Sequence, residues 1–257
     1  MLAPRPLFIF ALLAALTAAA RPNFIFVLTD DQDILLNGTA AMPILAREFV
    51  SNGASLHGYV DVPVCCPSRT STLSSRYSHN LNNTELGWCG DFHAVHENHT
   101  WIGALRDSGY QTAIFGKYTN DYSSFCRKNA HVPSDFSYAN LLCDDNNFFG
   151  NSFNVNGTMQ TLAEDIYMTN FIGNQSLAWL EGAAAAAASG GAPFFAYIAP
   201  HAPHVPATPA HEYENAPLPH GEQAPRTPNW DWATAHPSRT SSSPFRTSCT
   251  RAACAPP

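Results

Sequence analysis

The sequence predicts an α/β fold with a mostly parallel central sheet. Three apolar, β-rich runs, at residues 23–28, 110–118 and 193–199, alternate with segments whose apolar residues have helical spacing. With 257 residues, of which 45% are hydrophobic and 12% aromatic, the chain can bury one substantial core. The net charge of −7 argues against nucleic acid as a partner, because phosphate contacts require a basic face that 13 Lys and Arg residues do not supply.

Residues 1–20 have the pattern of a signal peptide. Arg5 precedes the apolar run 7–16, and small residues follow at 17–20. The run is too short to span a bilayer comfortably, so we expect no membrane attachment after signal cleavage; an N-terminal anchor is the alternative. Five Asn-x-Ser/Thr sequons fit a secreted glycoprotein, at Asn37, Asn82, Asn98, Asn156 and Asn174. The predicted location is the secretory pathway, leading outside the cell, to the cell wall or periplasmic space, or to a lysosome-like compartment.

The first strand, at 23–28, is continuously apolar, which predicts a central strand covered on both faces. It ends at Asp30 and Asp31. Ligands of open α/β sheets gather beyond the carboxyl ends of the strands, so this pair of carboxylates is well placed for a hard cation, although a helix cap or a solvated turn is the ordinary alternative. A helix is expected at 42–50, with a short strand at 55–62 after it. Further helices are expected at 100–106 and 161–180, the second opened by the capping box Thr161–Glu164 and extended by the alanines at 183–188.

The segment Val64–Ser74 joins a sulfur nucleophile to an arginine through the start of a helix. Pro67 suits a first helical turn and Ser68 can cap it, which places Cys65 just before the helix and Arg69 about one turn inside. Free N–H groups and the helix dipole favour an anion there, and Arg69 adds a positive fork for a tetrahedral oxyanion. In isolation, Cys65 is more simply a disulfide cysteine of a secreted loop. Seven cysteines leave one unpaired, and the sequence does not reveal the connectivity.

Two later strand ends carry candidate catalytic groups. The run at 110–118 ends on Lys117, which by itself would be an ordinary solvated lysine. The run at 193–199 enters a proline-stiffened loop that contains His201 and His204. Prolines restrict the backbone, and a restrained histidine suits acid/base chemistry near neutral pH, although two loop histidines need have no such role.

Together these motifs resemble the formylglycine-dependent sulfatases of the alkaline-phosphatase-like superfamily. Cys-x-Pro-Ser-Arg-x-x-x-Leu-Ser, from Cys65 to Ser74, is similar to the first family signature, except that Ser75 stands where the family usually has glycine. Gly-Tyr-x-Thr-Ala-x-x-Gly-Lys-Tyr, at 109–118, is similar to the second. The resemblance covers residues 21 to about 232. It is closest to arylsulfatase and N-acetylglucosamine-6-sulfatase, which carry an asparagine shortly after the lysine, as this chain has Asn120.

The resemblance implies a three-layer α/β sandwich, incomplete at the C-terminus, and a sulfuric ester hydrolase. Cys65, not Cys66, would be oxidised by the formylglycine-generating enzyme, because proline stands two positions after it. The hydrated formylglycine would attack sulfur, while one metal-binding site for calcium, formed by Asp30, Asp31 and residue 65, would help Arg69 and Lys117 to neutralise the oxyanion. The leaving alcohol would take a proton from Lys117 or His204, the latter matching the family's His-x-Pro pattern better than His201.

We therefore divide the chain into a signal peptide (1–20), the N-terminal part of a sulfatase catalytic domain (21–235) and an irregular or disordered tail (236–257). The substrate would be a sulfate ester, either an aryl sulfate or a sulfated sugar. Two alternatives stay open: a phosphomonoesterase or phosphonate hydrolase of the same superfamily, and an inactive truncated fragment. The second arises because the chain stops before the family's later Asp-Asn metal pair and second lysine, so we expect residues 21–257 alone to hydrolyse an aryl sulfate poorly or not at all.

Overall fold

The structure, a computed structural model, describes residues 21–33, 38–83, 88–144 and 147–217. These residues divide into two compact units, a larger one with 21–32 and 55–216 and a smaller one drawn from 33–54. The predicted signal peptide, the sequon at Asn37 and the predicted tail at 236–257 lie outside the described residues. In the part of the chain that the structure describes, no helix has the length and apolar character needed to cross a membrane.

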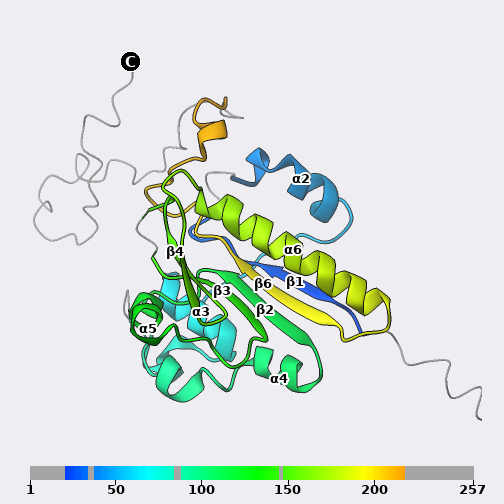
Figure 1. Ribbon diagram of the computed structural model, residues 1–257, viewed down its shortest axis with the longest axis vertical. Coiled ribbons are helices and arrows are strands. Elements are labelled where there is room, and N and C mark those ends of the chain that lie inside the picture. The colour runs from blue at the N-terminus through cyan, green and yellow to red at the C-terminus, as the bar shows by residue number, and fades with distance from the viewer. Residues whose placement is uncertain (1–20, 34–37, 84–87, 145–146, 218–257) are drawn as a thin grey trace, which may run out of the picture. The chain divides into compact units, whose positions relative to one another are not determined.

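The larger unit is built on a six-stranded sheet (Figure 1), with strands in the order β1-β6-β2-β3-β4-β5. Strands β1, β6, β2 and β3 are parallel to one another, whereas β4 and β5 run antiparallel to their neighbours. The predicted α/β class with a mostly parallel sheet is therefore confirmed. The strands are β1 (Phe24–Val27), β2 (Gln111–Gly116), β3 (Tyr138–Leu142), β4 (Ser152–Val155), β5 (Thr158–Thr161) and β6 (Phe194–Ala199).

Helices cover both faces of this sheet, with α6 along one side and α3 and α4 on the other (Figure 1). On the first side, Met168 and Ile172 of α6 pack in one cluster with Ala113 and Phe115 of β2. On the second, Ile114 of β2 packs in a separate cluster with residues of α3 and α4. Alternate residues of one strand thus supply two cores, which gives three layers. The helices are α3 (Cys65–Ser74), α4 (Trp101–Asp107), α5 (Tyr122–Asn129) and α6 (Met168–Ala188), with short turns η3 (Ser78–Leu81), η4 (Phe92–His96) and η5 (His211–Tyr213).

The predicted role of the first strand was wrong, because β1 is an edge strand of the described sheet. Three of its side chains are largely open to solvent, with Phe24 44%, Ile25 55% and Val27 56% exposed. A continuous apolar run identifies a strand but does not distinguish a covered strand from one whose outer neighbour is absent from the described residues.

The segment before α3 matches the prediction in part. The expected helix at 42–50 is present as two contiguous helical pieces, α2 (Pro43–Leu45) and η2 (Ala46–Val50), which follow the short turn η1 (Gly38–Ala41). Residues 55–62 form no strand, and Leu56 and Tyr59 are 88% and 97% exposed. The β-rich composition there finds no neighbouring strand among the described residues to pair with, and an isolated strand is not stable.

The predicted capping box at 161–164 was wrong as well. Thr161 ends strand β5, and α6 begins at Met168 after Tyr167, with no side-chain cap. The hairpin partner Ser152 pairs with Thr161 and so keeps this backbone extended. The alanines at 183–188 complete α6, as predicted for a helix extension.

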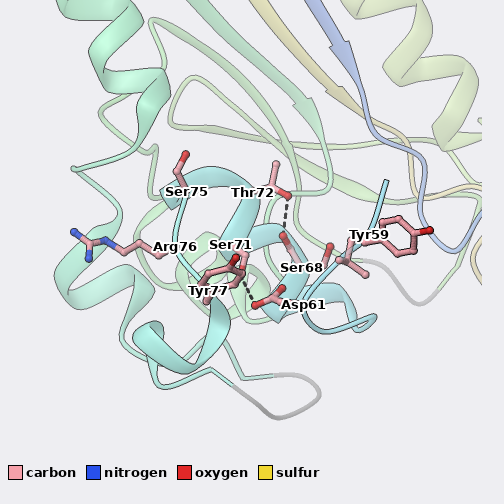
Figure 2. Close-up of a pocket in the computed structure, with 9 residues that line it drawn as sticks. Tyr59, Asp61, Ser68, Ser71, Thr72, Ser75, Arg76 and Tyr77 are labelled. Carbon is pink, nitrogen blue, oxygen red and sulfur yellow. Dashed lines mark hydrogen bonds between the residues drawn. The ribbon is translucent and has the colours of Figure 1, made fainter. Parts of the chain in front are cut away.

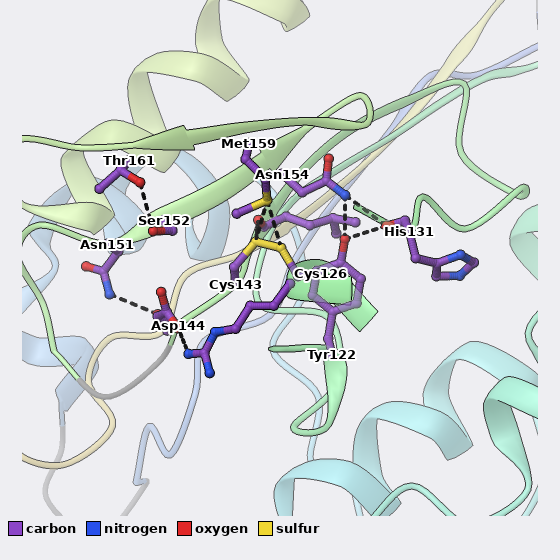
Figure 3. Close-up of a disulfide and its surroundings, with 12 residues drawn as sticks. Tyr122, Cys126, His131, Cys143, Asp144, Asn151, Ser152, Asn154, Met159 and Thr161 are labelled. Carbon is purple, nitrogen blue, oxygen red and sulfur yellow. Dashed lines mark hydrogen bonds and ion pairs between the residues drawn. A yellow bond between two sulfur atoms is a disulfide. The ribbon is translucent and has the colours of Figure 1, made fainter. Parts of the chain in front are cut away.

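Two disulfides lie among the described residues. Cys66 pairs with Cys89, and Cys126 pairs with Cys143, which leaves Cys65 as the free cysteine of the described part. The second bond joins α5 to the end of β3 (Figure 3), where the Asn154 amide also donates to the Tyr122 hydroxyl at 2.8 Å.

Candidate active site

The carboxyl ends of three parallel strands meet the first turn of α3 at one edge of the sheet. β1 leads to Asp30, β2 to Lys117 and β6 to His201. The end of β2 is fixed closely to β6, because the Lys117 N–H donates to the Ala199 oxygen at 2.8 Å. Gly116 permits this approach: its φ is +93°, and a Cβ there would lie 2.2 Å from the Ala199 oxygen.

Asp30 is the centre of the cluster. Its Oδ2 accepts from Lys117 Nζ at 2.7 Å and lies 3.0 Å from His201 Nδ1, and its Oδ1 lies 3.4 Å from Arg69 Nη2. Burial alone would raise the pKa of Asp30, but the His201 hydrogen bond and the charges of Arg69 and Lys117 outweigh burial and hold it far below its usual range. Asp30 is therefore a carboxylate at any physiological pH.

Arg69 connects helix α3 to this cluster and is almost fully buried, with 2% of the residue exposed. Besides facing Asp30, its Nη1 donates to the Lys117 backbone oxygen at 2.9 Å. The helix begins earlier than the sequence predicted. Val64 is the N-cap residue and its oxygen accepts from the Ser68 N–H, so Pro67 and Ser68 lie inside the helix and Ser68 is not the cap. Cys65 is consequently the first helical residue, with Arg69 one turn further on.

Cys65 is half-buried at the open side of the Asp30 cluster. Burial raises the pKa of its thiol, and although Lys117 acts in the opposite direction, Asp30 and Asp31 add to the rise. The unmodified side chain is thus a thiol at neutral pH and a poor nucleophile, since the thiolate is the reactive form.

Asp31 and His204 form the outer side of the site. Asp31, four residues after β1, has a φ of +58°, and 56% of its side chain is exposed. His204 Nε2 lies 3.6 Å from Asp31 Oδ2, and its ring stacks on that of His201 with centroids 4.4 Å apart.

His201, which the sequence analysis ranked below His204, lies deeper in the site. It is fully buried and contacts Asp30 directly, and its Nε2 meets no hydrogen-bond partner within the described residues. His201 and His204 share the His-x-Pro pattern, so this pattern does not distinguish them.

The donor atoms fit a hard cation in part. One ligand atom each from Asp30, Cys65 and His204 lie within 4.8 Å of one another, and the Asp31 carboxylate lies 3.6 Å from His204 Nε2. Carboxylate oxygens are the donors that Ca²⁺ prefers, whereas the Cys65 sulfur is a soft donor. An oxygen-bearing side chain at position 65 would make the set consistent with calcium.

The other predicted sites lie on the surface. The described sequon asparagines, Asn82, Asn98, Asn156 and Asn174, are all exposed. A hollow of about 400 Å³ follows the outward face of α3 (Figure 2) and contains none of the predicted catalytic or metal residues. Its lining combines hydroxyl groups with apolar surface, and Asp61 there accepts from the Ser78 N–H at 2.6 Å.

Sequence comparisons identify the family of the chain. The sequence profile of the Sulfatase family matches residues 22–232. N-acetylglucosamine-6-sulfatase of Capra hircus is 33% identical over 213 residues, covering 79% of this chain and 37% of that protein. Arylsulfatase of Volvox carteri is 34% identical over 200 residues, which cover 73% of this chain and 30% of that protein. The extracellular sulfatase SULF-1 homolog of Drosophila melanogaster is 33% identical over 167 residues, which cover 62% of this chain and 14% of that protein. The chain thus spans between 14% and 37% of the length of these relatives.

Solved structures share the fold. BT4656 in complex with its substrate D-glucosamine-2-N,6-O-disulfate matches with a TM-score of 0.58 at 22% identity, over 78% of this chain and 39% of that chain. Ps i-CgsB in complex with k-i-k-neocarrahexaose matches with a TM-score of 0.54 at 19% identity, over 77% of this chain and 50% of that chain. These likenesses, with the family match, confirm the predicted alkaline-phosphatase-like α/β fold.

Proposed function

Because the chain belongs to the sulfatase family, we propose that it carries the N-terminal part of a sulfuric ester hydrolase whose nucleophile is formylglycine at position 65 and whose metal is calcium. One observation carries the proposal: Lys117, Arg69 and His201 converge on a single buried carboxylate, Asp30, next to the free Cys65. This arrangement concentrates positive charge where a sulfate group would sit.

The two cations would bind the sulfate oxygens and stabilise the charge that develops on them. Arg69 offers a planar fork from the first turns of α3, and the free N–H groups of that helix start add to the attraction for an anion. Both cations are almost fully buried, so their charges are screened little by water, and they are held in place before substrate arrives.

Asp30, Asp31 and residue 65 would hold the calcium ion. When formed and bound, the hydrated aldehyde and Ca²⁺ would supply a geminal hydroxyl nucleophile and polarisation of a sulfate oxygen. The oxygens of a hydrated formylglycine would also replace the soft sulfur of Cys65 with hard ligands, which removes the mismatch in the donor set.

Proton transfer would fall to Lys117 or a histidine. Lys117 Nζ donates to Asp30 and lies among polar groups that fix its direction. His204 is partly exposed beside Asp31, where it can exchange protons with water and reach an incoming ester, whereas the more deeply buried His201 would orient Asp30.

The proposed substrates are aryl sulfates or sulfated sugars, in line with the names of the arylsulfatase and N-acetylglucosamine-6-sulfatase relatives. We further propose that the protein enters the secretory pathway and meets the formylglycine-generating enzyme there. Two disulfides in the described residues support an oxidising compartment.

The test combines chemistry and turnover. The chain is expressed through a secretory pathway that contains the formylglycine-generating enzyme, and the tryptic peptide ending at Arg69 is examined by mass spectrometry. We expect an aldehyde at position 65, and any turnover of 4-nitrophenyl sulfate by this partial chain to be slow and to be abolished by Cys65→Ala. An intact Cys65 thiol in active protein, or a preference for 4-nitrophenyl phosphate, would refute the proposal.

A further inference from the structure

The segment from Cys89 to Glu97 connects the two parts of the site without entering it. At one end, Cys89 is bonded to Cys66, the neighbour of Cys65. Four residues later, the ring of His93 contacts Thr119 and Asp121, which follow Lys117 closely in sequence. This segment, which includes η4, therefore links the start of α3 to the turn that begins at Lys117.

His93 makes its contacts with both ring nitrogens. Nδ1 lies 2.8 Å from Glu97 Oε1, and Nε2 lies 2.9 Å from Asp121 Oδ1 and 3.1 Å from Thr119 Oγ1. Ionised carboxylates only accept hydrogen bonds, and a neutral imidazole has a single N–H. With Glu97 and Asp121 both ionised, His93 can donate to the two together only as the imidazolium ion, so this geometry favours the charged form.

The surroundings stabilise that charge. The ring centroids of Phe125, Phe92 and Tyr118 lie 4.5, 5.3 and 6.0 Å from that of His93. Burial alone would lower the pKa of His93, but Asp121 and Glu97 raise it to about 9. Glu97 is shared with two further groups, His131 Nε2 at 2.7 Å and the Tyr118 hydroxyl at 3.2 Å. Burial favours a higher pKa for Glu97, yet the His93 hydrogen bond and charge bring it below its ordinary value.

The turn held in this way determines where Lys117 lies. Tyr118 and Thr119 are 1% and 4% exposed, so the backbone after Lys117 is packed in the core and anchored to His93 and Glu97. On its other side Lys117 is held by the Ala199 oxygen and by Arg69. A shift of the turn would thus move the Lys117 backbone relative to these two contacts.

We propose that His93 is a positioning residue: as an imidazolium ion bridging Glu97 and Asp121, it sets the backbone of Lys117 against Arg69 and Asp30, and loss of its proton loosens that placement. This inference rests on the proposed function only in giving Lys117 a catalytic role. The positioning of Lys117 by His93 depends on contacts within this chain alone.

The chain contains only two lysines, Lys117 and Lys128, which makes the test direct. With ¹³C,¹⁵N-lysine and carbon detection, the spectrum holds two lysine backbone carbonyl signals. The Lys117 carbonyl accepts from Arg69 and reports its placement, whereas Lys128 is exposed on α5 and serves as internal reference. A separate sample with ¹³Cε1-histidine gives the titration of His93.

In the unaltered chain, we expect the Lys117 carbonyl signal to move with the same pH midpoint as His93, near 9, while Lys128 stays constant. At pH 7, His93→Gln should shift the Lys117 signal, because one amide cannot donate to both carboxylates, and adding Asp121→Asn should move it back toward the original position. The matched control His99→Gln, at an exposed position, should leave it unchanged.

A constant Lys117 signal while His93 titrates would overturn the proposal, as would a His93 midpoint near the ordinary 6.5. If His93→Gln does not fold, the titration of the unaltered chain decides. Turnover is measured separately. A chain that prefers 4-nitrophenyl phosphate to 4-nitrophenyl sulfate contradicts the proposed function, and a Lys117 signal that follows His93 in that chain still supports the positioning. Sulfate turnover by a chain whose Lys117 signal does not follow the His93 titration supports the function and contradicts the positioning.

Discussion

Arg69 donates a hydrogen bond from Nη1 to the backbone oxygen of Lys117, 2.9 Å away. The contact joins the helix that begins at Cys65 to the strand end that carries the lysine, and the second Nη nitrogen of Arg69 faces Asp30 at 3.4 Å. One guanidinium therefore fixes the spacing of three site residues.

This double role predicts that Arg69→Lys is not a conservative change. A lysine ammonium cannot reach both the Lys117 oxygen and Asp30 as the planar fork does. We expect the free energy of unfolding to fall by about 2 kcal/mol, measured by urea denaturation, because one buried acceptor loses its donor. Arg47→Lys is the control, since Arg47 is 70% exposed and pairs with Glu48 on the surface. Similar losses in the two variants would contradict the role given to Arg69.

Asp30→Asn and Asp31→Asn should differ in their effect on the free energy of unfolding but should both weaken calcium binding. Asp30→Asn leaves Lys117 and Arg69 buried without their carboxylate, at a cost of about 3 kcal/mol in unfolding free energy. Asp31→Asn changes a side chain that is 56% exposed and should cost less than about 0.5 kcal/mol. Both variants should lose calcium affinity by isothermal titration calorimetry, in protein that carries formylglycine. Unchanged calcium binding in both would remove these residues as ligands.

Ser75→Gly should stabilise the chain. Ser75 follows the last residue of α3 and has the left-handed conformation, with a φ of +56°. This conformation is less favourable for a residue with a side chain than for glycine. The expected gain is about 0.5–1 kcal/mol in thermal or urea unfolding. Ser74→Gly, one residue earlier and still helical, should instead destabilise. A loss of stability in Ser75→Gly would show that the Ser75 side chain makes a compensating contact.

Alkaline pH should weaken the fold through His93. Because its pKa is raised from 6.5 to about 9, its contribution is fully present below pH 6.5 and is lost as pH rises toward 9. The unfolding free energy should fall by up to about 3 kcal/mol across this window. Denaturation curves between pH 6.5 and 9 check this, and His93→Gln should remove most of the slope. An equal slope in His93→Gln would assign the pH effect to other groups.

The sequence was sufficient to predict the groups at the strand ends. Asp30 and Lys117 each follow an apolar run, and parallel strands bring their carboxyl ends to one edge, so the convergence of these residues follows from topology. The hairpin β4–β5 was not predicted, because it is short, its outer strand is wholly exposed, and polar residues such as Asn154 interrupt its apolar pattern.

The two loop histidines show where sequence reasoning ended. Both stand two residues before a proline, so local pattern cannot rank them. What distinguishes them is side-chain direction: His201 turns inward to Asp30, and His204 turns outward to Asp31. The His201 ring also packs on Phe148, with centroids 5.4 Å apart, and this contact joins residues more than fifty positions apart, which no local pattern reveals.

The bond between Cys66 and Cys89 also bears on how the chain folds in an oxidising compartment. Cys65 and Cys66 are adjacent, so an unmodified chain offers Cys89 two thiols to choose between. Consecutive helical residues point about 100° apart, so a bond to Cys65 would rotate α3 and expel Cys66 from the core in which it is fully buried. A chain whose Cys65 has already lost its sulfur cannot form that isomer, and we expect it to refold from the reduced state with a higher yield of the native disulfide.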